Sequence, residues 1–170
     1  MENIAGIAFA VLVLVGLVGY QRLMHHLKYT KLRRLWEEGG EALRAGRLED
    51  AERALQQAVA TEGLWIPARQ LLAQVYALQG KLDLAEEEFK LAQAFQPKEP
   101  MGHFALALFY AQHRPERAEA ALESLERAMQ LDPATGALLR QHQQHFRGLE
   151  GHPRYQSLLG ATTTEPPDAG

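Results

Sequence analysis

Histidine is the residue type in this chain most able to bind a metal ion, since it occurs seven times among 170 residues and cysteine is absent. His142 and His145 are three residues apart, a spacing that places two imidazoles on one side of a helix. No acidic residue stands at a companion spacing, and His25 and His26 are consecutive, so they point to different sides of a helix. We therefore expect surface or terminal histidines, with no metal site and no cofactor.

The carboxylates offer little to catalysis. The acidic run 86–88 and the pair Glu123 and Glu126 fall where amphipathic helices are expected to face solvent. The sequence has no Gly-rich phosphate loop, no G-x-S-x-G turn and no H-E-x-x-H helix. A net charge of -3 and a pI of about 6.2 do not favour a nucleic acid. We expect no catalytic residue, no enzyme activity, no small-molecule substrate and no nucleic-acid partner.

Three segments of the chain repeat one pattern of alanines and larger apolar residues. The first begins at Leu48 (LEDAERALQQAVATEG) and the second at Leu82 (LDLAEEEFKLAQAFQP), which is an offset of 34 along the chain. The third copy follows at an offset of 36, so two extra residues must lie in the turn at 113–115. Apolar residues at three- and four-residue steps predict an amphipathic helix in each copy, and a first helix precedes it. A period of this length indicates a stack of helix pairs.

The second copy has small and aromatic residues at fixed positions of both helices, and Gly80 between them suits a left-handed helix end. In this it resembles the tetratricopeptide-repeat (TPR) family, whose six characteristic positions it matches in full. The first copy has Gly63 where the family has proline. The resemblance covers residues 31–133 and implies an all-α solenoid of three helix pairs. The matching residues of the second copy are Ala73, Tyr76, Ala85, Phe89, Ala92 and Pro97.

The resemblance also implies a protein-binding groove, because the first helix of each TPR pair lines a concave surface. The equivalent positions combine apolar side chains and amides, which would suit an amphipathic helix or an extended segment of a partner. Alternatively, Trp36 and Phe104 pack against the N-terminal helix or the C-terminal segment. The positions lack the Lys, Asn and Arg with which some TPR domains grip acidic chaperone C-termini, so that clamp is not expected. The groove residues are Trp36, Leu43, Gln70, Gln74, Met101, Phe104 and Leu108.

Residues 1–21 are expected to anchor the chain in a membrane. Residues 3–21 carry no charge, and a helix of that length nearly spans a hydrocarbon core of about 30 Å. The N-terminal flank has no Lys or Arg and no A-x-A pattern follows, so a retained anchor fits better than a signal peptide. Five basic residues from Arg22 to Arg34 precede Glu37, which places the N-terminus outside and the rest of the chain in the cytoplasm. The basic juxtamembrane segment, residues 22–30, either continues the membrane helix or lies along anionic lipid.

Residues 134–160 are expected to form a C-terminal capping helix and turn, which cover the last helix pair as solenoid ends require. Residues 161–170 have no large apolar side chain and are expected to be disordered. The apolar residues of the capping segment are Phe146, Leu149, Tyr155, Leu158 and Leu159.

The expected function is that of a membrane-tethered scaffold or assembly factor, which binds a client protein in the groove. Two alternatives remain: a permanent structural subunit of a larger membrane complex, contacting it through the transmembrane helix, and a targeting receptor on an organelle. The abundance of Ala, Leu, Gln and Arg favours a bacterial inner membrane. The lipid bilayer is the second expected partner.

Overall fold

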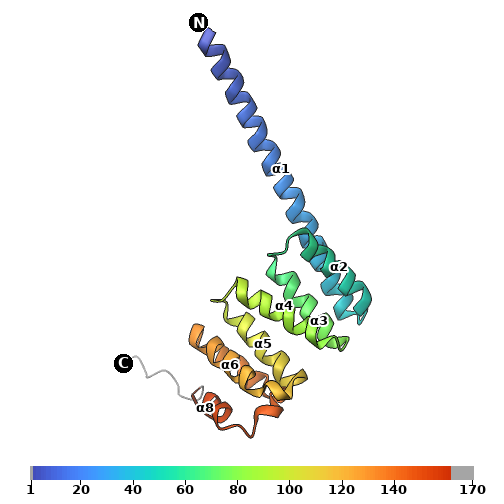
Figure 1. The fold of residues 1–170 in the computed structure, drawn as a ribbon, viewed down its shortest axis with the longest axis vertical. Coiled ribbons are helices and arrows are strands. Elements are labelled where there is room, and N and C mark those ends of the chain that lie inside the picture. The colour runs from blue at the N-terminus through green and yellow to red at the C-terminus, as the bar shows by residue number, and fades with distance from the viewer. Residues whose placement is uncertain (1, 162–170) are drawn as a thin grey trace, which may run out of the picture.

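The computed structural model describes the backbone of residues 2–161 and the side chains of residues 13–161. Every regular element in the described backbone is a helix (Figure 1). The α-helices are α1 (Glu2–Arg44), α2 (Leu48–Thr61), α3 (Ile66–Leu78), α4 (Leu82–Phe95), α5 (Pro100–His113), α6 (Ala118–Leu131), α7 (Thr135–Gln141) and α8 (Pro153–Ala161). Three short 3-10 helices are η1 (Pro115–Arg117), η2 (Gln143–His145) and η3 (Arg147–Leu149).

The helices are arranged in pairs that stack along the chain. The end of α1 packs on α2, α3 packs on α4, and α5 packs on α6, while α2 contacts α3 and α4 contacts α5 (Figure 1). Alanines at equivalent positions, Ala51, Ala85 and Ala121, are completely buried, because only a small side chain lets two helices approach this closely. The predicted all-α helical-hairpin solenoid is confirmed.

The turns inside the pairs follow the repeat as well. Gly80 adopts a φ of 75° after α3, as predicted, and Gly46, at the equivalent position of the preceding pair, adopts a φ of 72° after α1. Only glycine takes such a left-handed conformation without strain. The third pair has no glycine at this point. Its two extra residues are accommodated by η1, which begins at Pro115.

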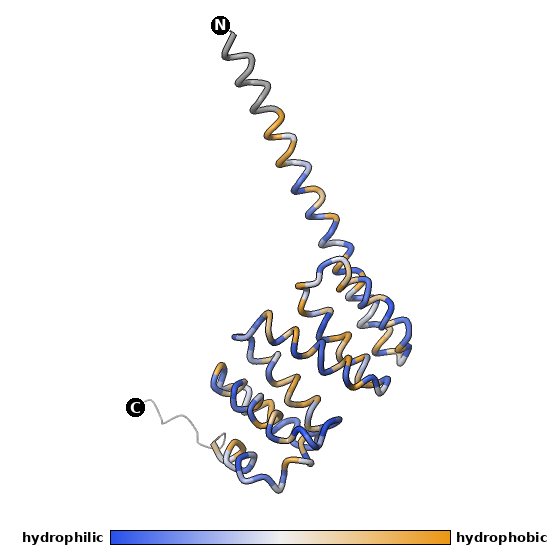
Figure 2. Tube along the Cα trace, viewed as in Figure 1, coloured by the Kyte–Doolittle hydropathy of each residue, from blue (hydrophilic) through white to orange (hydrophobic). Residues whose placement is uncertain are grey.

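The first helix is much longer than the others, with 43 residues. From residue 13 to 31 all side chains are exposed, and Leu32 is the first buried one. Figure 2 shows the apolar character of this helix falling toward the helix pairs. Within the part of the chain whose side chains are described, no helix has both the length and the apolar character needed to cross a membrane. The predicted span begins at residue 3, and its side chains up to residue 12 lie outside the described part.

The C-terminal segment, residues 134–161, packs against α5 and α6. Phe146, Leu149 and Tyr155 are buried there. Leu158 and Leu159 are half-buried against the same core. Of the tail expected to be disordered, Ala161 is the last residue of α8, and residues 162–170 lie outside the described part.

Candidate protein-binding groove

The first helices of the pairs lie side by side, so that their outward faces form one wall. Helix α3 contacts both α1 and α5. The helices meet at ordinary contact distance: a β-carbon on Gly40 would lie 3.8 Å from the Leu71 Cδ1 atom, and one on Gly102 would lie 3.9 Å from the Gln70 Nε2 atom. The predicted groove residues are distributed along this wall.

These residues differ in how far solvent reaches them. Trp36 is 36% exposed and Met101 is 45% exposed, and Gln74 is exposed as well. Phe104 is only 5% exposed, so it belongs to the core and does not offer a free ring to a partner. The remaining three are half-buried, with their outer atoms on the wall: Leu43, Gln70 and Leu108.

Phe104 is buried because the C-terminal segment lies over the α5 part of the wall. The Phe146 ring packs edge-on against Phe104, with ring centroids 5.8 Å apart, and His142 lies 6.3 Å from the same ring. Nearby, Gln112 Nε2 and His145 Nδ1 are 2.8 Å apart. Of the two closely spaced histidines, His142 thus contacts an aromatic ring and the exposed His145 is hydrogen-bonded to Gln112. Among the described residues, no three His, Asp or Glu side chains gather closely enough to hold a metal ion.

The wall is hollowed between α3 and α5, in a pocket of about 290 Å³ that we call the α3–α5 pocket. It brings together two predicted groove residues, Gln74 and Leu108. Apolar atoms dominate its lining, and two side-chain amides stand at its edge. The other lining residues are Ala77, Leu78, Phe89, Ala105, Phe109, Gln112 and His113.

Leu78 was not among the predicted groove residues, although it is the most exposed apolar side chain of the pocket, at 61%. A single exposed leucine is ordinary on a protein surface, so the sequence carried no signal that could have found it. His113 also lines the pocket, and burial lowers its pKa. A neutral imidazole at that edge adds a hydrogen-bonding group without adding charge.

Polar contacts between successive helix pairs line the opposite side of the array, on the second helices. Glu52 of α2 accepts hydrogen bonds from Lys81 Nζ at 2.8 Å and from Gln79 Nε2 at 2.9 Å. Glu86, at the equivalent position of α4, accepts one from the Tyr110 hydroxyl at 3.1 Å and lies 2.6 Å from Lys90 Nζ.

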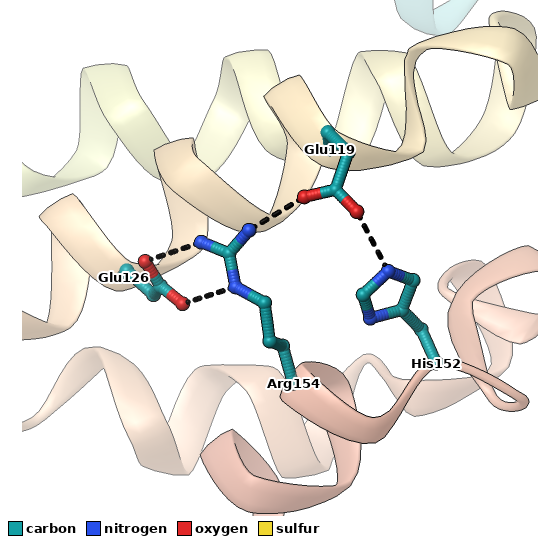
Figure 3. A network of polar contacts seen from close by, with 4 residues as sticks. All are labelled: Glu119, Glu126, His152 and Arg154. Atoms are coloured by element: carbon teal, nitrogen blue, oxygen red, sulfur yellow. Dashed lines mark hydrogen bonds and ion pairs between the residues drawn. The ribbon is translucent and has the colours of Figure 1, made fainter.

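The last of these contacts joins α6 to the start of α8 (Figure 3). Arg154 donates two hydrogen bonds to the Glu126 carboxylate, at 3.0 and 2.7 Å, and one to Glu119 at 2.5 Å. His152 lies 2.8 Å from the second oxygen of Glu119. A bidentate guanidinium–carboxylate pair fixes both distance and orientation, so it holds α8 in register on α6.

The sequence pattern predicts that the acidic run 86–88 faces solvent, and in the structure only Glu87 of the three is exposed. Glu86 is buried and Glu88 is half-buried, and Glu88 pairs with Arg69 of α3 at 2.5 Å. The expectation was wrong because Glu86 and Glu88 have partners on first helices, Tyr110 and Arg69, which compensate for their burial. The residue pattern within one helix does not reveal such partners.

These contacts lower the pKa values of the carboxyl groups of Glu52, Glu86 and Glu119. The Lys81 hydrogen bond holds the pKa of Glu52 below its ordinary value. Burial by itself would raise the pKa of Glu86, but hydrogen bonds from Lys90 and Tyr110 outweigh it and lower the pKa. The pKa of Glu119 is lowered chiefly by its hydrogen bond to His152.

Comparison with known proteins agrees with this architecture. Residues 66–99, which form α3 and α4, match the family model of the tetratricopeptide repeat. No curated protein matches the chain.

Solved structures share the fold. A mutant of the Thermobaculum terrenum O-GlcNAc transferase is 24% identical over 72% of this chain, with a TM-score of 0.61, and this chain spans only 22% of that protein. The Yersinia enterocolitica type III secretion translocator chaperone SycD is 20% identical over 78% of this chain and 92% of its own, with a TM-score of 0.59. SycD in complex with a peptide of the translocator YopD is 21% identical over 77% of this chain and 91% of its own, at 0.58. Residues 66–99 are therefore a tetratricopeptide repeat, set in a helical array whose fold recurs in these solved structures.

Proposed function

We propose that this chain is a membrane-tethered scaffold or assembly factor that binds a client protein on the wall of first helices. The α3–α5 pocket carries the proposal, because it combines an apolar floor with amides from Gln74 and Gln112 at its edge. A bulky apolar side chain would fill the floor while the amides bond the backbone beside it. The likeness to a chaperone whose structure holds a translocator peptide supports a peptide segment as the client.

The C-terminal segment acts as the cap of the array in this proposal. It covers the end of the core through Phe146 and Tyr155, and Arg154 fixes it to α6. Because the segment already lies over Phe104, the client binds on the part of the wall formed by α1 and α3 and on the α3–α5 pocket.

The tether is the N-terminal part of α1. Its support is the uncharged stretch 3–21, whose large apolar side chains are exposed in the described part, from Val13 to Tyr20. The five basic residues from Arg22 to Arg34 support an N-terminus outside and a helical array in the cytoplasm, at a bacterial inner membrane.

A second function is favoured by the exposed apolar surface of α1. The chain would then be a permanent subunit of a membrane complex, which it contacts through this helix and not through the wall of first helices. Under the first function, altering the wall of first helices should remove the partner. Under the second, altering the apolar surface of α1 should remove it.

The test captures the tagged full chain from membranes dissolved in mild detergent and quantifies copurifying chains by mass spectrometry. The groove variant is Gln74→Ala with Leu78→Ser, because both side chains are exposed and their loss spares the core. The matched control is Gln57→Ala with Leu84→Ser, an exposed amide and an exposed leucine on the second helices α2 and α4. Phe104 is unsuited to this test, because its replacement would open a cavity in the core.

We expect the groove variant to lose a defined partner at least tenfold, and the control variant to retain it. A partner that stays at a fixed ratio in both variants would refute binding at the α3–α5 pocket and support the permanent subunit.

A further inference from the structure

A groove outside the wall of first helices lies between residues 20–31 of α1, which we call the stalk, and the end of α2. We call it the stalk groove; its volume is about 630 Å³. It is open to solvent and its lining is mostly apolar. The lining residues are Tyr20, Gln21, Met24, His25, Leu27, Lys28, Lys31 and Thr61.

The apolar floor is a continuous stripe of the helix. Tyr20, Met24 and Leu27 follow one another at steps of four and three residues, so they share one face of α1, and all three are exposed. The stripe continues directly from the uncharged stretch of residues 3–21. No element of the described part covers it.

Two lysines form the rim of the stalk groove at the end nearer the helix pairs. Lys28 is exposed and forms an ion pair with Glu62, which follows the end of α2. Lys31 is exposed and has no carboxylate partner among the described residues. An ammonium group has three donors, so Lys28 can bond a second anion beside Glu62.

The surroundings of this rim are strongly positive. Five of the 18 Lys and Arg residues lie between residues 22 and 34, a segment that holds none of the 21 Asp and Glu residues. Three of these five are paired with carboxylates: Arg33 with Glu37 at 2.8 Å, Arg34 with Glu38 at 3.3 Å, and Lys28 with Glu62. Arg22 and Lys31 have no carboxylate partner among the described residues, so the unpaired positive charge of this segment lies on residues 22–31.

We propose that the stalk groove binds an anionic phospholipid of the bilayer, with its phosphate on Lys28 and Lys31 and an acyl chain along Tyr20, Met24 and Leu27. The inference rests on the proposed tether. A single ligand must offer an anion at one end and a long apolar chain at the other, and an anionic lipid does both. Lys28 and Lys31 lie about 10 and 15 Å beyond residue 21 along α1, and their long side chains can extend back along the helix toward the headgroups when residues 3–21 span the hydrocarbon.

The experiment uses the full chain, reconstituted in vesicles of phosphatidylcholine and phosphatidylglycerol in equal amounts. Spin-labelled forms of each lipid report, by electron paramagnetic resonance, the fraction immobilised on the protein. The test variant is Lys28→Gln with Lys31→Gln. The control variant is Arg33→Gln with Arg34→Gln, which removes the same charge from the same helix at residues that do not line the stalk groove. Resistance to extraction by alkaline carbonate is measured on every sample.

We expect phosphatidylglycerol to be immobilised more than phosphatidylcholine, by up to about fivefold for each lysine, and this preference to fall with added salt. The preference should disappear in the lysine variant and persist in the arginine variant. If the wild-type chain resists carbonate but shows no preference, or if the lysine variant keeps it, the lipid site is refuted and the tether stands. If carbonate extracts the wild-type chain, both the tether and the lipid site are refuted.

Discussion

Gly39 and Gly40 are neighbours in α1 with opposite surroundings. A β-carbon on Gly39 would lie 2.6 Å from the Leu55 Cγ atom, which belongs to a completely buried side chain of α2. A β-carbon on Gly40 would meet its nearest atom, Arg44 Nη1, at 3.5 Å, which is ordinary contact. At Gly39 the absence of a side chain is needed for packing against α2, whereas at Gly40 glycine only lowers the helix propensity.

Substituting each glycine by alanine should therefore change stability in opposite directions. Gly39→Ala should lower the free energy of unfolding by about 1–3 kcal/mol, because Leu55 must leave its rotamer. Gly40→Ala should raise it by about 0.5–1 kcal/mol, because alanine restricts the unfolded chain and favours helix. Thermal unfolding of the full chain in mild detergent, followed by circular dichroism, measures both. Equal shifts of the two variants would contradict the close approach at Gly39.

Residue patterns predicted the small positions of the repeat well and the acidic residues poorly. Spacing alone predicted the small positions Ala51, Ala85 and Ala121, because a small residue repeated at a fixed period lets two helices approach closely. Glu86 was misplaced, because its burial depends on Tyr110, which lies on a neighbouring helix pair. Two alternatives were open for Phe104, and the second holds: its ring packs against Phe146 of the C-terminal segment, which lies far from it in the sequence.

At the scale of elements, the C-terminal segment depends on one ring. Phe146 is completely buried and packs between Phe104 and Tyr155, with the Tyr155 ring centroid at 6.2 Å. The segment contains only short helices, so its own helical propensity contributes little, and tertiary packing must hold it.

Phe146→Ala should destabilise the chain by about 3–5 kcal/mol, through lost burial and the cavity left behind. Phe95→Ala is the control, because the Phe95 ring is exposed on α4 and its main polar neighbour is the Arg69 guanidinium at 5.9 Å. Hydrogen exchange of α7 and α8 should accelerate in the first variant and stay unchanged in the second. Slow exchange of α8 in Phe146→Ala would show that Arg154 alone holds it.

Helix boundaries followed turn chemistry wherever it was present. Gly80 marked the end of α3, and the longer turn at 113–115 became η1, as the changed offset predicted. Composition predicts an anchor, a basic segment and the start of the first pair within residues 1–44, whereas residues 2–44 form one helix in the structure. Composition changes along these residues, but the first proline is Pro67, so the backbone has no reason to break.

At the scale of the whole molecule, carboxylates on the second helices join successive helix pairs. Glu52, Glu86 and Glu119 all have pKa values below their ordinary ones. A carboxyl with a lowered pKa in the folded chain contributes stability above its unfolded pKa, and this contribution is lost as the pH falls through the folded pKa. The array should therefore weaken in acid at several of its interfaces at once.

We expect the free energy of unfolding to decline as the pH falls below about 4.5, the ordinary glutamate pKa. Glu52→Gln with Glu86→Gln should make this decline shallower, because glutamine does not titrate. Glu49→Gln with Glu123→Gln, both exposed, should leave it unchanged. Urea unfolding at a series of pH values measures the three curves, and identical slopes for all of them would rule out a contribution from these contacts.

The unbroken first helix sets the angular position of the array about its stalk. An α-helix turns by about 100° for each residue, so one residue inserted between positions 22 and 31 would raise the array by only about 1.5 Å but swing its binding wall through more than a quarter of a circle. Seven inserted residues would nearly restore the azimuth at a height about 10 Å greater. In the proposed tethered arrangement, helical phase, and not reach alone, would decide which neighbour in the plane of the bilayer the wall of first helices faces.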